Sequence, residues 1–398
     1  MTSTESPLPG TSASDAGAPP TQRLRLGRSR ASVPRLYGQV LGLVTLLVVF
    51  GLAMVLSSTS IGSYAQTHSF FSTFSRQATL AVVGYVLMLI VSRLRIETLY
   101  RYTNLLFLVA LFLQLLTVIG LGQQINGNRN WLAIGPIQFQ PSELLKAALI
   151  LWMAREFTRL GPGPFTLRAL AWPLCGGVLA ALLLIVKGGD LGTTVIVAMI
   201  CAGVFLVAKV PWKYLLSGVV LVALGALALA LGGGHSRGAR IQAWLKGGDC
   251  SDYTTTCWQS SHGKWALANG GLFGVGLGNS KSKWAWLPEA GNDFIFAVIG
   301  EELGMIGALA LILLFLGLAV LLVRAIARTH DRFSTVILTG GMVWIVGQAF
   351  VNISVVLGLL PVLGVPLPFI SSGGSALLVC LLMVGAMLAV IRKESDVE

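Results

Sequence analysis

The fold is decided by the segment from Asp293 to Val323, which reads DFIFAVIGEELGMIGALALILLFLGLAVLLV. From Met305 onward no charged residue interrupts the apolar run, and about 20 such residues are enough for a helix to cross a bilayer. The whole segment is longer than a bilayer requires, so we expect its helix to tilt or to project beyond the membrane. It therefore predicts a membrane-spanning helix.

Segments of the same kind occur along the chain. Only 11% of the residues are charged and 55% are hydrophobic, with a mean hydropathy of +0.79, whereas a soluble domain carries about 25% charged residues. A soluble globular enzyme is therefore excluded, and we predict an all-α polytopic membrane protein with about ten transmembrane helices. The expected spans are 37–57, 77–92, 104–122, 140–157, 169–186, 190–208, 212–231, 293–323, 333–357 and 370–391.

The basic residues predict the orientation of these spans. The chain has 28 Lys and Arg against 16 Asp and Glu, and most of the basic residues fall in the N-terminal tail and in alternate loops that share one side. The short loops of the other side carry only Arg76, Arg129 and Lys187. Because basic loops tend to stay in the cytoplasm, both termini are predicted to be cytoplasmic, and no nucleic-acid partner is needed to explain the charge.

The chain is expected to divide into a membrane domain and two tails. Residues 1–36 are rich in Ser, Pro, Gly and Ala and then basic, which predicts a disordered cytoplasmic tail. Residues 37–391 form the ten-helix domain, and residues 392–398 are a short cytoplasmic tail. Between the seventh and eighth spans, residues from about 232 to 292 form one long external loop.

Charged residues inside apolar spans are the first candidates for a functional site, because each costs a few kcal/mol unless it has a partner. Glu143 and Lys146 are one helical turn apart near the outer end of the fourth span, behind Pro141 at a first helical position. They form either a self-neutralising structural pair or the wall of a polar cavity. Asp190 opens the sixth span on the same side, as a helix cap or as a contact of Lys146.

The densest acidic cluster lies where the long external loop meets the eighth span. Asp293 stands at this junction and is either a helix N-cap or a general base, because partial desolvation makes a carboxylate more basic. Glu301 and Glu302 follow about 12 Å further along a helix and should face the protein interior. No zinc site is readable from the spacing of the cysteines and histidines.

The last external loop is punctuated by prolines and then by a Gly/Ser run that begins at Ser371. Such a stretch is either an ordinary loop or a re-entrant segment that lines a cavity. At the start of the tenth span, the run can offer free backbone N–H groups to an anion.

Together these motifs resemble the SEDS family (shape, elongation, division, sporulation), with a resemblance that covers about 37–391. The external-loop sequence around Lys264-Trp265 resembles actinobacterial members. The sequences of Leu287-Pro288-Glu289-Ala290 and of Gly358 to Ser375 resemble the division members more than the elongation members. The matching motifs are Pro141-Ser142-Glu143-x-x-Lys146, Asp190-Leu191-Gly192-Thr193, Leu287-Pro288-Glu289 with Asp293-Phe294-Ile295-Phe296-Ala297, Glu301-Glu302-Leu303-Gly304, and Gly358 to Ser375.

The resemblance implies a peptidoglycan glycosyltransferase that polymerises lipid II at the outer face of the cytoplasmic membrane, at the division septum. Its implied partners are a class B penicillin-binding transpeptidase of the FtsI type and other division proteins. The family's essential external-loop aspartate corresponds to Asp293. Its fourth-span pair corresponds to Glu143 and Lys146, and its sixth-span acid to Asp190. This chain departs from the family at Gly291-Asn292, His262-Gly263 and Ser372, so no role is carried over to those side chains.

The chemistry needs a base, a counter-charge for the leaving pyrophosphate and a lipid-accessible groove. Asp293 is the candidate base for the acceptor hydroxyl, and a divalent cation can share the counter-charge although no ligand set is readable. The candidate substrate-binding residues are Glu143, Lys146, Asp190, Arg240, Glu301 and Ser371. The alternatives are a lipid II flippase, a non-catalytic scaffold for a transpeptidase, and an elongation rather than a division role.

The external loop contains two cysteines, Cys250 and Cys257. The exterior is oxidising and the ring between them is short, so we predict a disulfide that contributes modest stability. Two free thiols are the alternative.

Overall fold

The computed structural model describes residues 2, 32–125, 128–134, 137–163, 165–170, 176–214, 216, 218, 244, 258–284 and 286–397. Most of the predicted N-terminal tail and of the predicted seventh span lie outside these residues, as do Arg240, Cys250 and Cys257.

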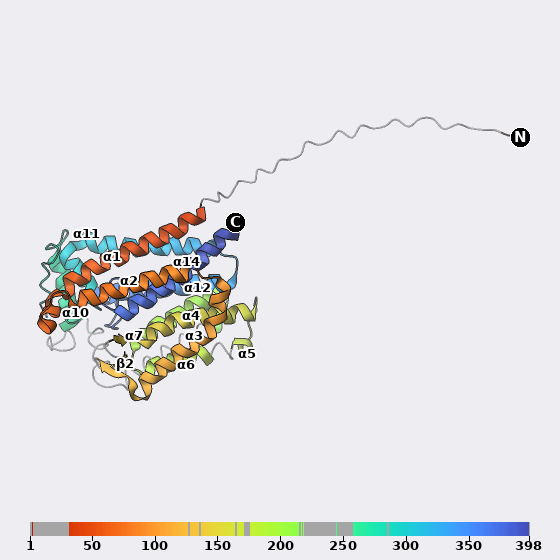
Figure 1. Cartoon of the computed structure of the whole chain (residues 1–398), viewed down its shortest axis with the longest axis horizontal. Coiled ribbons are helices and arrows are strands. Elements are labelled where there is room, and N and C mark those ends of the chain that lie inside the picture. The colour runs from red at the N-terminus through yellow and green to blue at the C-terminus, as the bar shows by residue number, and fades with distance from the viewer. Residues whose placement is uncertain are drawn as a thin grey trace.

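The described part is a bundle of long helices that run side by side, as Figure 1 shows. The start of α1 and the end of α14 lie at the same end of the bundle, as the predicted topology requires. The helical elements are α1 (Ser32–Thr67), α2 (Ser72–Ser92), α3 (Ile96–Leu116), the π-helix η1 (Thr117–Leu121), α4 (Pro141–Leu160), α5 (Leu167–Leu170), α6 (Gly176–Lys187), α7 (Leu191–Val207), α10 (Trp258–Gly270), α11 (Ile295–Arg328), α12 (Arg332–Met342), the π-helix η3 (Val343–Gly347), α13 (Gln348–Val356) and α14 (Gly374–Val397).

The prediction of a helical, polytopic membrane protein is confirmed. Within the described ranges, 6 helices are long and apolar enough to cross a membrane, and α6 and α7 are shorter apolar helices. The count of ten spans stays a prediction. The six are Arg35–Thr67, Ser72–Ser92, Ile96–Leu121, Ile295–Arg328, Arg332–Val356 and Gly374–Glu394.

Helix α4 lies inside the bundle and not at its lipid-facing surface. It contacts α3, α7, α12 and α14, and its side chains are buried without a break from Leu145 to Ala154. Glu143 and Lys146 are therefore enclosed by protein, which is where ionisable groups in a membrane protein are tolerated. This placement explains how a span with both Glu143 and Lys146 is stable.

Helix α11 is broken at Gly304, where φ is 69° and ψ is −168°. The loop after α10 bonds to the backbone groups that this break frees: Met305 N donates to Gly271 O (2.9 Å) and Val275 N donates to Glu301 O (3.0 Å). After the break, exposed apolar side chains follow one another from Met305 to Val323. At 1.5 Å per residue that face is about 27 Å long, close to the thickness of a bilayer's hydrocarbon core.

A three-stranded antiparallel sheet, which the sequence did not predict, lies between α3 and α4. Its strands are β1 (Gln123–Ile125), β2 (Asn128–Ile134) and β3 (Ile137–Phe139), in the order β1-β2-β3. Arg129 N donates to Gly188 O (2.9 Å), which ties β2 to the turn between α6 and α7. The sheet is thereby held against the N-terminal end of α7.

Candidate functional site

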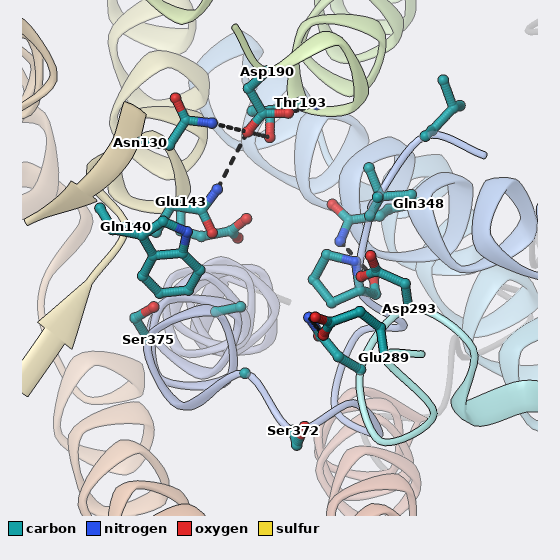
Figure 2. Close-up of a pocket in the computed structure, with 18 of the residues that line it drawn as sticks. Asn130, Gln140, Glu143, Asp190, Thr193, Glu289, Asp293, Gln348, Ser372 and Ser375 are labelled. Carbon is teal, nitrogen blue, oxygen red and sulfur yellow. Dashed lines mark hydrogen bonds between the residues drawn. The ribbon is translucent and has the colours of Figure 1, made fainter. Parts of the chain in front are cut away.

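A polar cavity of about 270 Å³ lies where α4, α7 and α14 begin. Because the cavity is lined by residues at the start of α14, it lies at the opposite end of the bundle from the end of that helix, and so on the predicted outer side. Figure 2 shows Asp293, Glu289 and Gln348 across the cavity from Glu143, Gln140 and Asp190. The side chains and backbone that line it come from Asn130, Trp131, Gln138, Gln140, Glu143, Lys146, Asp190, Thr193, Gln259, Glu289, Asn292, Asp293, Gln348, Val362–Pro366, Ser372, Gly373, Ser375 and Ala376.

The predicted contact between Glu143 and Lys146 is present in the first turn of α4. Lys146 Nζ lies 2.9 Å from Glu143 Oε1, and both side chains are almost fully buried. Glu143 Oε2 is also buried, and none of the described residues gives it a hydrogen bond. The pair therefore forms a cavity wall as well as a neutral structural unit, with one carboxylate oxygen still able to accept a hydrogen bond.

Gln348 is a further cavity residue, which sequence analysis missed. Its Oε1 accepts hydrogen bonds from Lys146 Nζ (2.9 Å) and from Trp344 Nε1 (3.0 Å), and its Nε2 donates to Pro366 O (2.8 Å). The π-helix η3 brings Trp344 and Gln348 to this position, and such local widening of a helix is frequent at functional sites. Gln348 thus links the buried lysine to the loop of residues 362–366.

Asp190 both caps α7 and lines the cavity. Its carboxylate accepts hydrogen bonds from Thr193 N (2.8 Å) and Thr193 Oγ1 (2.7 Å), as a helix cap does. It also accepts from Asn130 Nδ2 (2.9 Å) and Gln140 Nε2 (3.3 Å), drawn in Figure 2. The predicted cap is therefore present, whereas the contact with Lys146 stays a prediction, and the carboxylate links the β-sheet to α7.

Asp293 lies immediately before α11 and is partly buried. The capping position of α11 is Phe294, with no side-chain capping bond, so the geometry does not favour the cap interpretation of Asp293. Its carbonyl oxygen accepts from Asn352 Nδ2 (2.8 Å). Its carboxylate lines the cavity beside Gly364, where an added Cβ would come within 3.6 Å of Oδ2.

Two predicted site residues lie elsewhere. Ser371 is behind the cavity wall, where its Oγ donates to Asn292 O (2.7 Å) and accepts from Leu367 N (2.8 Å), while its neighbour Ser372 lines the cavity. Glu301 is buried beside a second hollow, where it accepts from Ser282 Oγ (2.7 Å) and Asn269 Nδ2 (3.0 Å). Arg240 lies outside the described residues.

The β-sheet and its flank supply most of the remaining polar wall: Asn130, Gln138 and Gln140, with the ring of Trp131 between them. These uncharged residues lie at or outside the ends of the expected apolar spans, where a polar side chain needs no special explanation, so this group was not predicted. No cluster of three or more His, Cys, Asp and Glu able to hold a metal occurs among the described residues. The cavity thus offers carboxylates on facing walls, one buried ammonium group and several amides, which suits a ligand rich in hydroxyl and amide groups.

Comparison with known proteins gives consistent matches. Residues 38–396 match the sequence model of the cell cycle protein family of FtsW, RodA and SpoVE. A probable peptidoglycan glycosyltransferase FtsW of Mycobacterium tuberculosis is 35% identical over 372 residues, which are 93% of this chain and 70% of that protein. The stage V sporulation protein E of Bacillus subtilis is 34% identical over 349 residues, 88% of this chain and 93% of that protein.

Solved structures agree in fold. A chain from a peptidoglycan synthase complex that coordinates polymerization and crosslinking has a TM-score of 0.74 and 26% identity, over 89% of this chain and 97% of that chain. The rod shape determining protein RodA of Thermus thermophilus has a TM-score of 0.66 and 26% identity, over 90% of this chain and 97% of its own.

Proposed function

Because this chain belongs to the FtsW, RodA and SpoVE family of cell cycle proteins, we propose that it is a peptidoglycan glycosyltransferase. It polymerises lipid II into glycan strands at the outer face of the cytoplasmic membrane. The observation that carries this proposal is the cavity itself, in which Asp293 faces the buried pair of Glu143 and Lys146.

The proposed reaction joins the 4-hydroxyl of one lipid-linked disaccharide to the anomeric carbon of another. Asp293 accepts the hydroxyl proton as the oxygen attacks, and the carbon inverts as undecaprenyl pyrophosphate leaves. The leaving group is already a good one, so a strong general acid is not needed. Asp293 suits this role because it lies just before α11, and its backbone carbonyl is held by a hydrogen bond from Asn352.

The remaining cavity residues would bind and orient the substrate. Lys146 supplies the one buried positive charge in the wall, which offsets part of the charge on the pyrophosphate. The amide of Gln138 is a hydrogen-bonding group for sugar hydroxyl and acetamido groups. Orienting two reactants in this way contributes as much to rate as the base itself.

The proposed setting is septal cell-wall synthesis with a class B penicillin-binding transpeptidase. Two findings support it: the mycobacterial relative is named FtsW, and a structural neighbour comes from a complex that couples polymerization to crosslinking. In a complex of the two proteins, each new glycan strand would pass directly from this protein to the transpeptidase.

The test is reconstitution. The purified protein is incubated with lipid II, with and without its transpeptidase, beside a mock preparation from cells that lack the chain. Glycan strands in the complete reaction, absent from the mock, are the expected result. Transfer of lipid II across vesicle membranes without any glycan would instead indicate a flippase, and neither activity would indicate a scaffold.

A further inference from the structure

A second hollow, of about 510 Å³, is lined by residues that adjoin the lining of the proposed catalytic cavity along the chain. It is formed by one face of α10 and by Lys281, Ser282, Trp284 and Trp286. Its walls include three tryptophans and a histidine: His262, Trp265, Trp284 and Trp286. We call it the aromatic groove.

Three of the groove rings, His262, Trp265 and Trp286, contact one another or Trp258. His262 stacks on Trp258 with ring centroids 4.1 Å apart, and Trp258 lies parallel to Trp286, at 6.4 Å and an interplanar angle of 6°. Trp258 Nε1 also donates to Trp286 O (2.7 Å). Trp284 and Trp286 are 63% and 58% exposed, so the groove presents open aromatic surface outside the packed core.

The floor of the groove is polar. Glu301, Ser282 and Asn269 line it and bond to one another. A different surface is suited to the lipid tails of the bilayer. The loop after α10, which bonds to the break in α11, exposes Leu272 and Phe273, the latter 79% exposed, next to Met305. Aliphatic and phenyl side chains suit lipid tails, whereas tryptophan over a polar floor suits a ligand with both apolar and hydroxylated faces.

The groove continues from the catalytic cavity. Gln259 and Glu289 line the cavity, and His262 and Trp286, each three residues away along the chain, line the groove. Along α10 this step is one helical turn, about 5 Å, and the face from Gln259 to Asn269 extends about 15 Å. The cavity, at about 270 Å³, has no room for a lengthening polymer, which must therefore leave by an adjoining surface.

We propose that the aromatic groove binds the growing glycan strand as it leaves the catalytic cavity. A pyranose ring has an apolar face of C–H bonds that packs on an indole ring, and its hydroxyl and acetamido groups bond to the exposed polar side chains of the groove, Asn269 and Lys281. Holding the strand keeps it beside the cavity between additions, so the groove sets strand length. This inference rests on the proposed polymerase function.

The experiment uses the purified complex with its transpeptidase and lipid II, and compares wild type with Trp284→Ala and Trp286→Ala. Strand length and the initial rate of lipid II consumption are both measured. We expect clearly shorter strands, with the initial rate changed less than twofold. Two exposed aromatic controls, Trp212→Ala and Phe273→Ala, should leave strand length unchanged. Trp212 follows α7 at the other end of the bundle, and Phe273 is exposed on the loop after α10 and does not line the groove.

A binding measurement tests the groove without catalysis. Soluble glycan oligosaccharides, released from peptidoglycan by a muramidase, are titrated into the same complexes. Loss of one indole should weaken their binding roughly three- to tenfold. If wild type makes no glycan but binds the oligosaccharides through Trp284, the proposed polymerase function fails, and glycan binding by the groove is the part of the inference that stands.

Three results would overturn the proposal. The first is unchanged strand length and oligosaccharide binding in both groove variants. The second is an equal shortening in Phe273→Ala, which would assign the effect to lipid anchoring of the loop. The third is loss of the transpeptidase from the groove variants during purification, which would make the groove a protein-docking surface.

Discussion

Lys146 is tolerated in the core because Glu143 lies against it. With Lys146 1% exposed, removing either partner leaves a buried charge uncompensated, which costs about 3–5 kcal/mol. We expect Lys146→Met and Glu143→Gln each to lower the thermal unfolding temperature and to impair glycan formation. The double variant should be more stable than the sum of the two losses predicts. Strictly additive losses in unfolding experiments on the solubilised protein would argue against a direct pair.

Gln348 is expected to act as a positioning residue through its bonds to Lys146 and Pro366. Gln348→Leu keeps the volume but removes these bonds, so we expect kcat to fall roughly tenfold, with folding largely preserved. Steady-state kinetics with lipid II measure the split between kcat and KM. The matched control is Gln114→Leu, another buried amide, which lies in α3 away from the cavity. Equal effects of the two variants would reduce Gln348 to a structural role.

The site residues that the sequence predicted were those whose charge is energetically unfavourable in or beside an apolar span. Glu143, Lys146, Asp190 and Asp293 stood out because charges in or beside apolar spans need a reason, and all four line one cavity. Glu301 stood out for the same reason, yet its partners come from Asn269 and a loop whose path no local pattern predicts. A side-chain amide such as that of Gln348 costs less free energy in an apolar span than a charged group does, so Gln348 did not stand out in the sequence.

At the scale of elements, Gly304 determines how α11 meets the loop after α10. A Cβ there would lie 2.4 Å from Gly274 N and 2.5 Å from Leu272 O, at a φ that L side chains rarely adopt. We therefore expect Gly304→Ala to lower the thermal unfolding temperature by several degrees. Gly42→Ala, in α1, has nothing within 4 Å and should be neutral or stabilising. Equal unfolding temperatures of both variants would mean that the contact between the loop after α10 and the break in α11 contributes little to stability.

The helices were predictable because long apolar runs leave little choice in a bilayer, where backbone groups must be satisfied within the segment. Their ends were not: α1 continues to Thr67, about ten residues beyond the expected span, because its last turns leave the hydrocarbon and need no apolar side chains. The β-sheet was missed because short strands with mixed polarity resemble an ordinary loop.

At the scale of the whole molecule, the predicted topology places the turn between α1 and α2 outside and the turn between α11 and α12 inside. Ser69→Cys should therefore react with a membrane-impermeant maleimide on intact cells, and His330→Cys only after permeabilisation. The wild-type chain should react from outside only after reduction, because Cys201 and Cys380 are buried, Cys175 is predicted to lie within the fifth span, and Cys250 is predicted to pair with Cys257. Labelling of His330→Cys on intact cells would refute the orientation, and labelling of unreduced wild type would refute the disulfide.

The whole account depends on Asp293, and one comparison tests it most directly: glycan formation by matched wild-type and Asp293→Asn complexes with the transpeptidase. Asn is nearly isosteric but cannot take up the proton, so the account predicts a correctly inserted variant that keeps its partner and loses activity by roughly 10²-fold or more. Asp331→Asn is the control, because Asp331 caps α12 at the other end of the bundle and Asn preserves a cap. Near-equal rates of glycan formation in wild type and Asp293→Asn would contradict the account.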